Sequence, residues 1–219
     1  MKPNTFGALC WLLCLQYFAA EAAAASAWGG SYGYAHDFIS DLGAVGCGAQ
    51  ICSPWHGLMN ASFVLQGLLI VAGALAWIGA APKGALARVG LALTGASGLG
   101  VIAVGLAPED AAHAPHYLGA AENFLFCNAG SALLGLALWR QGARWIGAAG
   151  VAAGLTGLFG VACIALGADL GLGAGGIERL TAYPFVPWIA MMGAWRLSGA
   201  RFHANVAPVG EKTSAARAA

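Results

Sequence analysis

Charged side chains are scarce in this sequence: Asp, Glu, Lys and Arg together make up 9% of its 219 residues. Soluble globular domains have about a quarter of their residues charged, so this chain cannot cover a water-exposed surface with charge. The formal net charge of +1 leaves no basic face for nucleic acid, and six cysteines are too few for a disulfide scaffold. These shortages exclude a soluble domain, a nucleic-acid-binding protein and a disulfide-stapled fold.

Hydrophobic residues, by contrast, make up 59% of the chain. A bilayer core about 30 Å thick requires about 20 apolar residues per helix. Six segments meet this requirement, and they span residues 6–27, 57–80, 87–107, 117–139, 145–167 and 180–197. The sequence therefore predicts an all-α, polytopic membrane helix bundle of six transmembrane helices over residues 1–197, with the lipid bilayer as its main partner. Residues 198–219 lose the apolar pattern and are predicted to be a disordered cytoplasmic tail.

The first apolar segment admits two interpretations. Its single Lys2, apolar core and alanine-rich end are typical of a cleaved secretory signal. However, the apolar stretch continues to Trp28 and is long enough to span a membrane, although Gln16 and Glu21 interrupt it. We favour a retained first helix, in which Glu21 is a buried carboxylate that is hydrogen-bonded or protonated inside the bundle.

Basic residues fall almost entirely on one side of the six predicted helices. Nine of the ten lysines and arginines lie on the side of the two termini, and Arg179 is the exception. By the positive-inside rule, this asymmetry places both termini in the cytoplasm and predicts a multi-pass protein of the inner (plasma) membrane.

Acidic residues and histidines have the opposite distribution. Eight of the nine acids and four of the five histidines are predicted to lie toward the outer face, in three connections and in the outer turns of helices. They are expected to assemble a polar pocket there. The candidate pocket residues are His36, Asp37, Ser40, Asp41, His56, Asn60, Glu109, His113, His116, Glu122, Glu178 and Arg179.

A metal site is one chemistry that these groups would support. His56, His113 and His116, with an aspartate of the first connection, supply the donor types of a zinc hydrolase with three protein ligands and one water. Against this, Pro115 is expected to break helical geometry between His113 and His116, and no HExxH motif occurs. The alternative is that the histidines cap helix ends and form hydrogen bonds at the interface.

The stretch "HDFISDLG", residues 36–43, adds two further arrangements. On a helical turn, Asp37 and Asp41 would share one face and divide acid and base roles. Ser40 and His36 have the spacing of a nucleophile and its base. Because neither an oxyanion-hole signature nor a nucleophile elbow accompanies them, solvated residues that cap helix ends are the alternative.

Arg179 is the single basic residue predicted at the outer face. One guanidinium among so many carboxylates should form a structural ion pair, and we expect Asp41 or Glu109 to be its partner. The alternative is bidentate recognition of a lipid phosphate or a substrate carboxylate.

Two cysteines, Cys47 and Cys52, bracket "GAQI" in the first outer connection. In an oxidising exterior they are predicted to form a disulfide that closes a small loop. The other four cysteines lie within predicted helices and are expected to be small packing residues.

Several motifs stand at the predicted outer face. They are Ile39-Ser40-x-Leu42-Gly43, Asn60 with Gly67, the connection from Pro108 to His116, and Gly176-x-Glu178-Arg179. Together, over about residues 5–197, they resemble the DUF998 family of bacterial and archaeal membrane proteins. The resemblance implies about six helices and no assigned reaction, and the predicted disulfide is not a feature of the family.

For function, the sequence predicts an integral membrane protein of unassigned role whose outer pocket handles a lipid headgroup or a small molecule. A metal-dependent membrane hydrolase acting at the outer face, with zinc as its cofactor, is one alternative. A structural or regulatory membrane subunit is another alternative. In that case the polar groups would only form contacts at the membrane interface. A transporter has less support, because the chain shows no internal repeat.

Overall fold

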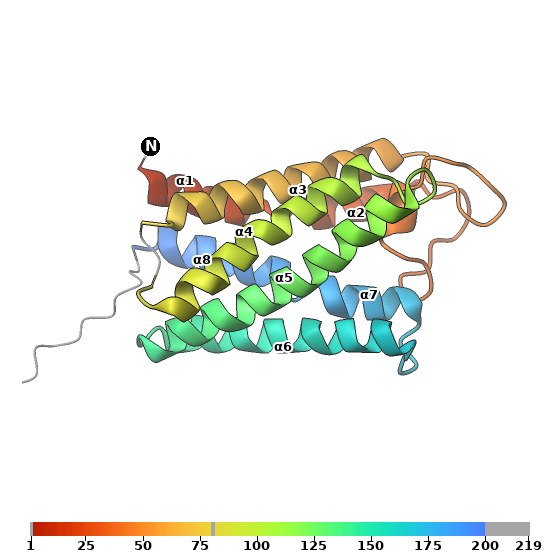
Figure 1. Ribbon diagram of the computed structural model, residues 1–219. Coiled ribbons are helices and arrows are strands. Elements are labelled where there is room, and N and C mark those ends of the chain that lie inside the picture. Colours follow the sequence, from red (N-terminus) through yellow and green to blue (C-terminus); the bar gives the residue numbers. More distant parts are fainter. Residues whose placement is uncertain (1, 80–81, 200–219) are drawn as a thin grey trace, which may run out of the picture.

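The computed structural model describes residues 2–79 and 82–199, and this part of the chain is all-α, as predicted. Residues 200–219 of the predicted tail lie outside the described residues. The long helices run side by side in one bundle (Figure 1). They are α1 (Pro3–Leu13), α2 (Gln16–Ser26), α3 (His56–Trp77), α4 (Ala85–Leu106), α5 (His113–Arg140), α6 (Arg144–Leu166), α7 (Ala174–Ala182) and α8 (Phe185–Leu197), with a short 3-10 helix, η1 (Ser40–Gly43), between α2 and α3.

Five helical segments are long and apolar enough to cross a membrane. The first, Asn4–Ser26, combines α1 and α2, which are separated at Cys14 and Leu15 where the backbone bonds tighten to the i→i−3 pattern. The other four are α3, α4, α5 and α6. Several such segments in one chain are the signature of a multi-pass membrane protein.

The sixth predicted segment, 180–197, is not one continuous helix as expected. It is divided between α7 and α8, which are interrupted at Tyr183 and Pro184. Proline has no N–H and its ring crowds the preceding turn, so Pro184 ends one helix and starts the next. Asn128 of α5 donates to the Thr181 carbonyl beside this interruption at 3.0 Å. With 13 residues, α8 alone is shorter than the roughly 20 residues of a bilayer crossing.

The two ends of the bundle differ in charge. The start of α1, the α3–α4 and α5–α6 connections and the end of α8 lie at one end, which we call the basic end (Figure 1). The three other long connections lie at the opposite end, which we call the acidic end. The described basic residues at the basic end are Lys2, Lys83, Arg88, Arg140, Arg144 and Arg196. The acidic residues of the acidic end are Asp37, Asp41, Glu109, Asp110, Asp169 and Glu178. The predicted separation of charge along the bundle is therefore confirmed.

Small residues allow the helices to approach closely. A Cβ at Gly150 of α6 would lie 2.6 Å from the ring of Trp188 in α8, and one at Gly154 would lie 2.4 Å from the Asn128 carbonyl of α5. Such contacts leave no room for a side chain and are typical of membrane helix interfaces. The glycines of α6 thus form a packing seam.

The buried side chains form two clusters along the bundle. One contains Trp11, Trp77 and Trp188, and all three are almost fully buried. The other contains Leu42 of η1 and Met59 of α3, so it lies toward the acidic end. This second cluster supports the region in which the predicted polar groups gather.

Candidate functional site

The short helix η1 lies at the acidic end, packed against α2 and α3. At its start, the Ile39 amide donates to Glu178 Oε2 of α7. At its end, the Gly43 carbonyl accepts from Asn60 Nδ2 of α3 at 2.8 Å. Leu42 between them is fully buried. These bonds hold η1 against helices that lie far away in the sequence.

Arg179 of α7 and Glu21 of α2 form the ion pair of this region. Arg179 Nη2 lies 3.1 Å from Glu21 Oε1, and Nε donates to the same oxygen at 3.2 Å. The two side chains are buried, with 8% and 2% of their surfaces exposed. Tyr183 OH also donates to Glu21 Oε1, at 2.6 Å. The pair connects the first helical segment of the bundle to the last.

Every N–H of the Arg179 guanidinium has a partner within the protein. Nη1 donates to the Tyr34 and Asp37 carbonyls at 2.8 and 2.9 Å. It also donates to the Gly175 carbonyl at 3.0 Å, and Nη2 donates to Tyr32 OH. The Tyr34 ring lies 4.8 Å from the guanidinium carbon, within cation–π range. Because a guanidinium has five N–H donors and all are used, the predicted structural ion pair is confirmed and no donor remains for a ligand phosphate.

The predicted identity of the partner is wrong, since Glu21 takes the place expected for Asp41 or Glu109. The Asp41 carboxylate instead accepts from the Phe38 amide at 2.7 Å. Burial, together with hydrogen bonding and like charge from Glu109, raises the pKa of Asp41 to about 7. The Asp41 carboxyl therefore faces Glu109 and the Phe38 amide, and not Arg179.

The two other arrangements expected in residues 36–43 are absent from the described structure. Asp37 is not on a helix with Asp41: it precedes η1 in a turn, where its carboxylate accepts from the Gly33 amide at 2.7 Å. No hydrogen bond is formed between Ser40 and His36, since Ser40 lines an internal cavity and His36 is exposed. Both carboxylates therefore accept backbone hydrogen bonds at or just before η1. Asp41 is buried and does not cap η1, so it is not the solvated cap residue of the alternative interpretation.

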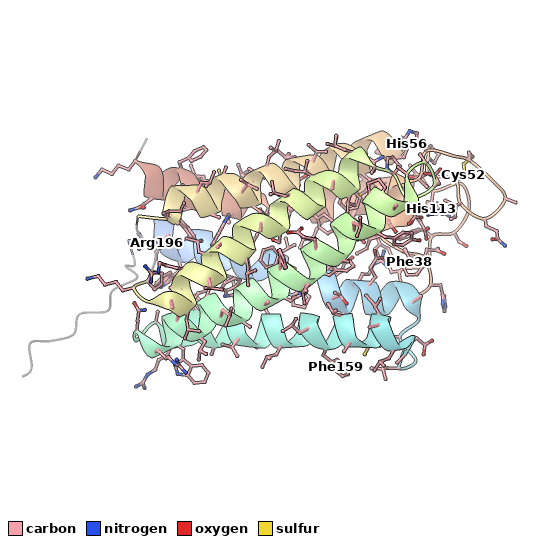
Figure 2. All side chains as sticks on the ribbon, in the orientation of Figure 1. Phe38, Cys52, His56, His113, Phe159 and Arg196 are labelled. Carbon is pink, nitrogen blue, oxygen red and sulfur yellow. A yellow bond between two sulfur atoms is a disulfide. The ribbon has the colours of Figure 1, made fainter. Side chains whose placement is uncertain are left out.

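The three histidines proposed as metal ligands do not converge. His116 is buried, and its Nδ1 is 2.7 Å from the Ala107 carbonyl. His113 is exposed and stacks on a neighbouring tyrosine, while His56 Nδ1 is 2.8 Å from the Ser53 carbonyl. Figure 2 shows His56 and His113 separately at the acidic end. Within residues 2–79 and 82–199, no three His, Cys, Asp or Glu side chains are placed to hold one metal ion.

The expectation that Pro115 breaks helical geometry is also wrong. α5 begins at His113, so Pro115 lies in the first turn of the helix. Backbone N–H groups of a first turn have no partner within the helix, and proline is tolerated there. His113 and His116 consequently share a helix, but one faces the surface and the other faces the interior.

Cys47 and Cys52 form the predicted disulfide, with their Cα atoms 4.2 Å apart. The loop before it is joined to the α4–α5 connection, because Asp110 accepts from the Val45 and Gly46 amides at 3.1 and 2.6 Å. Slight desolvation of Asp110 acts in the opposite direction, but these amides lower the pKa of its carboxyl. Two of the three acidic-end connections are thus fastened together.

A cavity of about 70 Å³ lies inside the bundle, with Ile39 and Ser40 in its wall. Most of its wall is apolar, and no lysine or arginine is among the described residues that line it. Its polar side chains are Tyr17, Ser40, Gln66, His116, Asn123, Cys127 and Glu178. Of the predicted pocket residues, only Ser40, His116 and Glu178 thus line this cavity. Those that do not are His36, Asp37, Asp41, His56, Asn60, Glu109, His113, Glu122 and Arg179.

Gln66 of α3 lines this cavity, and its side chain includes a hydrogen-bond donor that has no partner among the described residues. Its side-chain carbonyl accepts from Gln16 Nε2 at 3.3 Å, but its own Nε2 is buried without a partner among the described residues. The residue is only 3% exposed. Leaving a buried donor unpaired costs about 1–3 kcal/mol. By contrast, the Asn123 amide donates to the Ser97 carbonyl at 3.1 Å.

A family model described as "Protein of unknown function (DUF998)" matches residues 12–195. The chain belongs to the DUF998 family. No curated protein and no solved structure matches it. We call Arg179 and the residues bonded to it the cap around Arg179, and they are Glu21, Tyr32, Tyr34, Asp37, Gly175 and Tyr183. The matched region includes every residue of this cap and of the cavity wall.

In this DUF998 protein, the motifs noted in the sequence meet in space. Gly43 of the first motif bonds to Asn60 of the second, and Ile39 bonds to Glu178 of the last. His116, at the end of the third, lines the cavity. The motifs that carry the family resemblance therefore build the acidic end and the cavity wall.

Sequence reasoning did not include Gln66 or Tyr17 among the candidate pocket residues, although both line the cavity. A signal for Gln66 was present, because it is a lone amide in the apolar run "FVLQGLL". Polar side chains inside a membrane span are expensive and mark functional sites by default. Tyr17 gave no comparable signal, since a tyrosine in an apolar helix is ordinary core.

Proposed function

We propose that this DUF998 protein crosses the inner (plasma) membrane six times, with its acidic end outside and both termini in the cytoplasm. Five candidate spans support this topology, and α7 with α8 supplies the sixth, interrupted crossing between the two ends (Figure 1). The basic end carries all described lysines and arginines except Arg179, which supports the orientation. The Glu21–Arg179 pair supports a retained first helix, because it ties that helix to α7.

We infer that the cavity beside η1 binds a small amphipathic molecule. The observation that carries this inference is that Gln66, whose Nε2 has no partner among the described residues, lies in the mostly apolar wall of the cavity. Ligand sites are mostly apolar with a few placed polar groups, and a ligand oxygen would relieve the cost of the unpaired donor. A cavity of about 70 Å³ has room for several waters or for one small polar group with a short alkyl portion.

The charge of the cavity wall defines the class of ligand. A carboxyl from Glu178 lines the cavity, and no lysine or arginine is among its described lining residues. The N–H donors of the Arg179 guanidinium are all bonded to groups of the protein. An anionic group would have no cation to pair with. A hydroxyl or an amide would find acceptors and the Gln66 donor, and an amine would find acceptors. The proposed ligand is therefore neutral or cationic, and it is not a phosphate headgroup.

The cap around Arg179 has a supporting role in this proposal. Its bonds join α7 to α2 and to the turn before η1. The elements α7 and η1 contribute Glu178 and Ser40 to the cavity wall. Ion pairs and hydrogen bonds that are satisfied internally position neighbouring side chains without contacting a ligand. The metal-dependent hydrolase has no corresponding support, because the histidines expected as ligands lie apart.

The charge preference can be tested with three small molecules that share one alkyl chain: butanol, butylamine and butyrate. Each is added to the purified full-length protein in detergent, and the melting temperature is measured. We expect butanol and butylamine to raise it and butyrate to leave it unchanged, because butyrate would bring a negative charge to a wall that contains Glu178 and no lysine or arginine among its described residues. Gln66→Met, which removes the donor at similar volume, should reduce the effect of butanol. A rise with butyrate equal to that with butylamine would contradict the proposed ligand class.

A further inference from the structure

A second hollow runs along the outside of the bundle between α3 and α4. Its volume is about 480 Å³. On α4, the lining residues from Arg88 to Leu99 are three or four positions apart, or adjacent, and so share one face of the helix. The lining residues from Val71 to Ile78, on α3 and at its C-terminal end, have the same spacing. Together the lining residues are Val71, Ala74, Leu75, Ile78, Arg88, Leu91, Ala92, Gly95, Ala96 and Leu99. We call this hollow the α3–α4 groove.

The residues at the base of the α3–α4 groove are buried, and those at its sides are exposed. Ala74 and Leu91 are buried at its base, with 4% and 6% of their surfaces exposed. Leu75, Ile78 and Leu99 stand exposed at its sides, with 62%, 65% and 61% of their surfaces exposed. Buried residues at the base and exposed, large aliphatic residues at the sides leave a channel that an extended hydrocarbon chain fits.

The length of the groove matches one leaflet of a membrane. At 1.5 Å per helical residue, the distance along α4 from Arg88 to Leu99 is about 16 Å. Half of a hydrocarbon core about 30 Å thick is about 15 Å. The groove thus begins at the basic end of the bundle and has about the length of one leaflet.

Arg88 is the polar residue of the groove, and it stands at the basic end. Its side chain is exposed and has no hydrogen-bond or ion-pair partner within residues 2–79 and 82–199. A guanidinium binds phosphate oxygens in a bidentate way. Lys83 precedes Arg88 by five residues and adds positive charge at the same end.

We propose that the α3–α4 groove binds one anionic phospholipid of the leaflet at the basic end, with its phosphate on Arg88 and one acyl chain along the groove. The groove supplies the apolar length, and Arg88 fixes the headgroup at the depth where lipid phosphates lie. Basic residues at a membrane surface attract anionic lipids. This site is separate from the cavity beside η1 and does not depend on its ligand.

The experiment uses native mass spectrometry of the full-length protein, delipidated in detergent and titrated with phosphatidylglycerol or phosphatidylcholine. The first variant, Arg88→Gln, removes the charge from an exposed side chain. The second, Ala92→Phe, places a bulky ring in the groove from an exposed position. Arg144→Gln is the matched control, because Arg144 is an exposed arginine at the basic end that does not line the groove.

We expect phosphatidylglycerol to bind the parent more tightly than phosphatidylcholine. Arg88→Gln should weaken phosphatidylglycerol binding about tenfold, as the loss of a charge-assisted contact does, and Ala92→Phe should weaken the binding of both lipids. Arg144→Gln should bind as the parent does. Equal losses for Arg88→Gln and Arg144→Gln would show general attraction to charge and overturn the site. Parent-like binding by Ala92→Phe would overturn it too, and equal binding of both lipids by the parent would overturn the anionic assignment.

Discussion

Arg179 Nη2 lies 3.1 Å from Glu21 Oε1, although 158 residues separate the two in the sequence. This ion pair closes the bundle, because it joins the first helical segment to the last at the acidic end. Both partners are buried and additionally hydrogen-bonded. Removing either partner would therefore leave the other charge buried and unpaired.

Breaking this pair from one side should be costly. Arg179→Ala leaves the Glu21 carboxylate buried without its cation, and such changes cost about 3–5 kcal/mol. We therefore expect a clearly lower melting temperature in detergent, with partial rescue by Arg179→Lys, which keeps the charge but loses the fork. The double variant Arg179→Ala with Glu21→Gln should lose less than the sum of the two single changes. If Arg179→Ala melts like the parent, the pair does not support the bundle.

The contact between Gly43 and Asn60 should show a coupling of a different kind. A Cβ at Gly43 would lie 2.4 Å from Asn60 Oδ1, so Gly43→Ala should overpack this site and destabilise the protein by about 1–3 kcal/mol. In an Asn60→Ala background the obstructing oxygen is gone, and the same change should cost much less. Thermal unfolding of the four proteins in this cycle measures the coupling. Equal costs in both backgrounds would show that η1 does not pack on Asn60.

Asp41 should give the protein a measurable dependence of stability on pH. Its pKa is raised to about 7 in the folded protein, against about 3.9 for an unperturbed aspartate. The folded state therefore holds a proton that the unfolded state releases, and stability falls as pH rises from about 4 to about 7. Asp41→Asn removes this titrating group. The free energy of unfolding of the variant, relative to that of the parent, should therefore increase across that interval. Asp169→Asn, in an exposed loop, is the control. A constant difference between Asp41→Asn and the parent at all pH values would contradict the assignment.

Membrane orientation can be read by labelling introduced cysteines in intact cells. Asp169 and Lys83 are exposed at the acidic and basic ends, respectively. We expect Asp169→Cys to react with an impermeant thiol reagent and Lys83→Cys to react only after the membrane is permeabilised. Gly173 is unsuitable as a labelling site, because a Cβ there would lie 2.2 Å from the Ala35 carbonyl. The reverse labelling pattern would place the acidic end and its cavity in the cytoplasm.

Much of the architecture follows from the sequence, because hydrophobicity over 20 residues is a local property. The helices and the separation of charge between the ends were predictable in this way. The Cys47–Cys52 disulfide was predictable because the two cysteines are close together in one connection. The break at Pro184 was missed because an average over a long apolar window hides a single proline. The choice of Glu21 over Asp41 as the partner of Arg179 depends on how α2 and α7 meet, and no local pattern encodes that. Gln66 shows the same limit, since its missing partner is a property of the assembled cavity.

The central claim is that the cavity beside η1 is a binding site, and blocking the cavity tests it most directly. Ala120 of α5 lines the cavity, so Ala120→Phe would fill it, whereas Ala152→Phe adds the same ring on an exposed face of α6. The measurement is the rise in melting temperature caused by butanol in the parent and in both variants. The account predicts a rise in the parent and in Ala152→Phe and its loss in Ala120→Phe. An equal rise in all three proteins would contradict it, because butanol would then act on the detergent-covered surface.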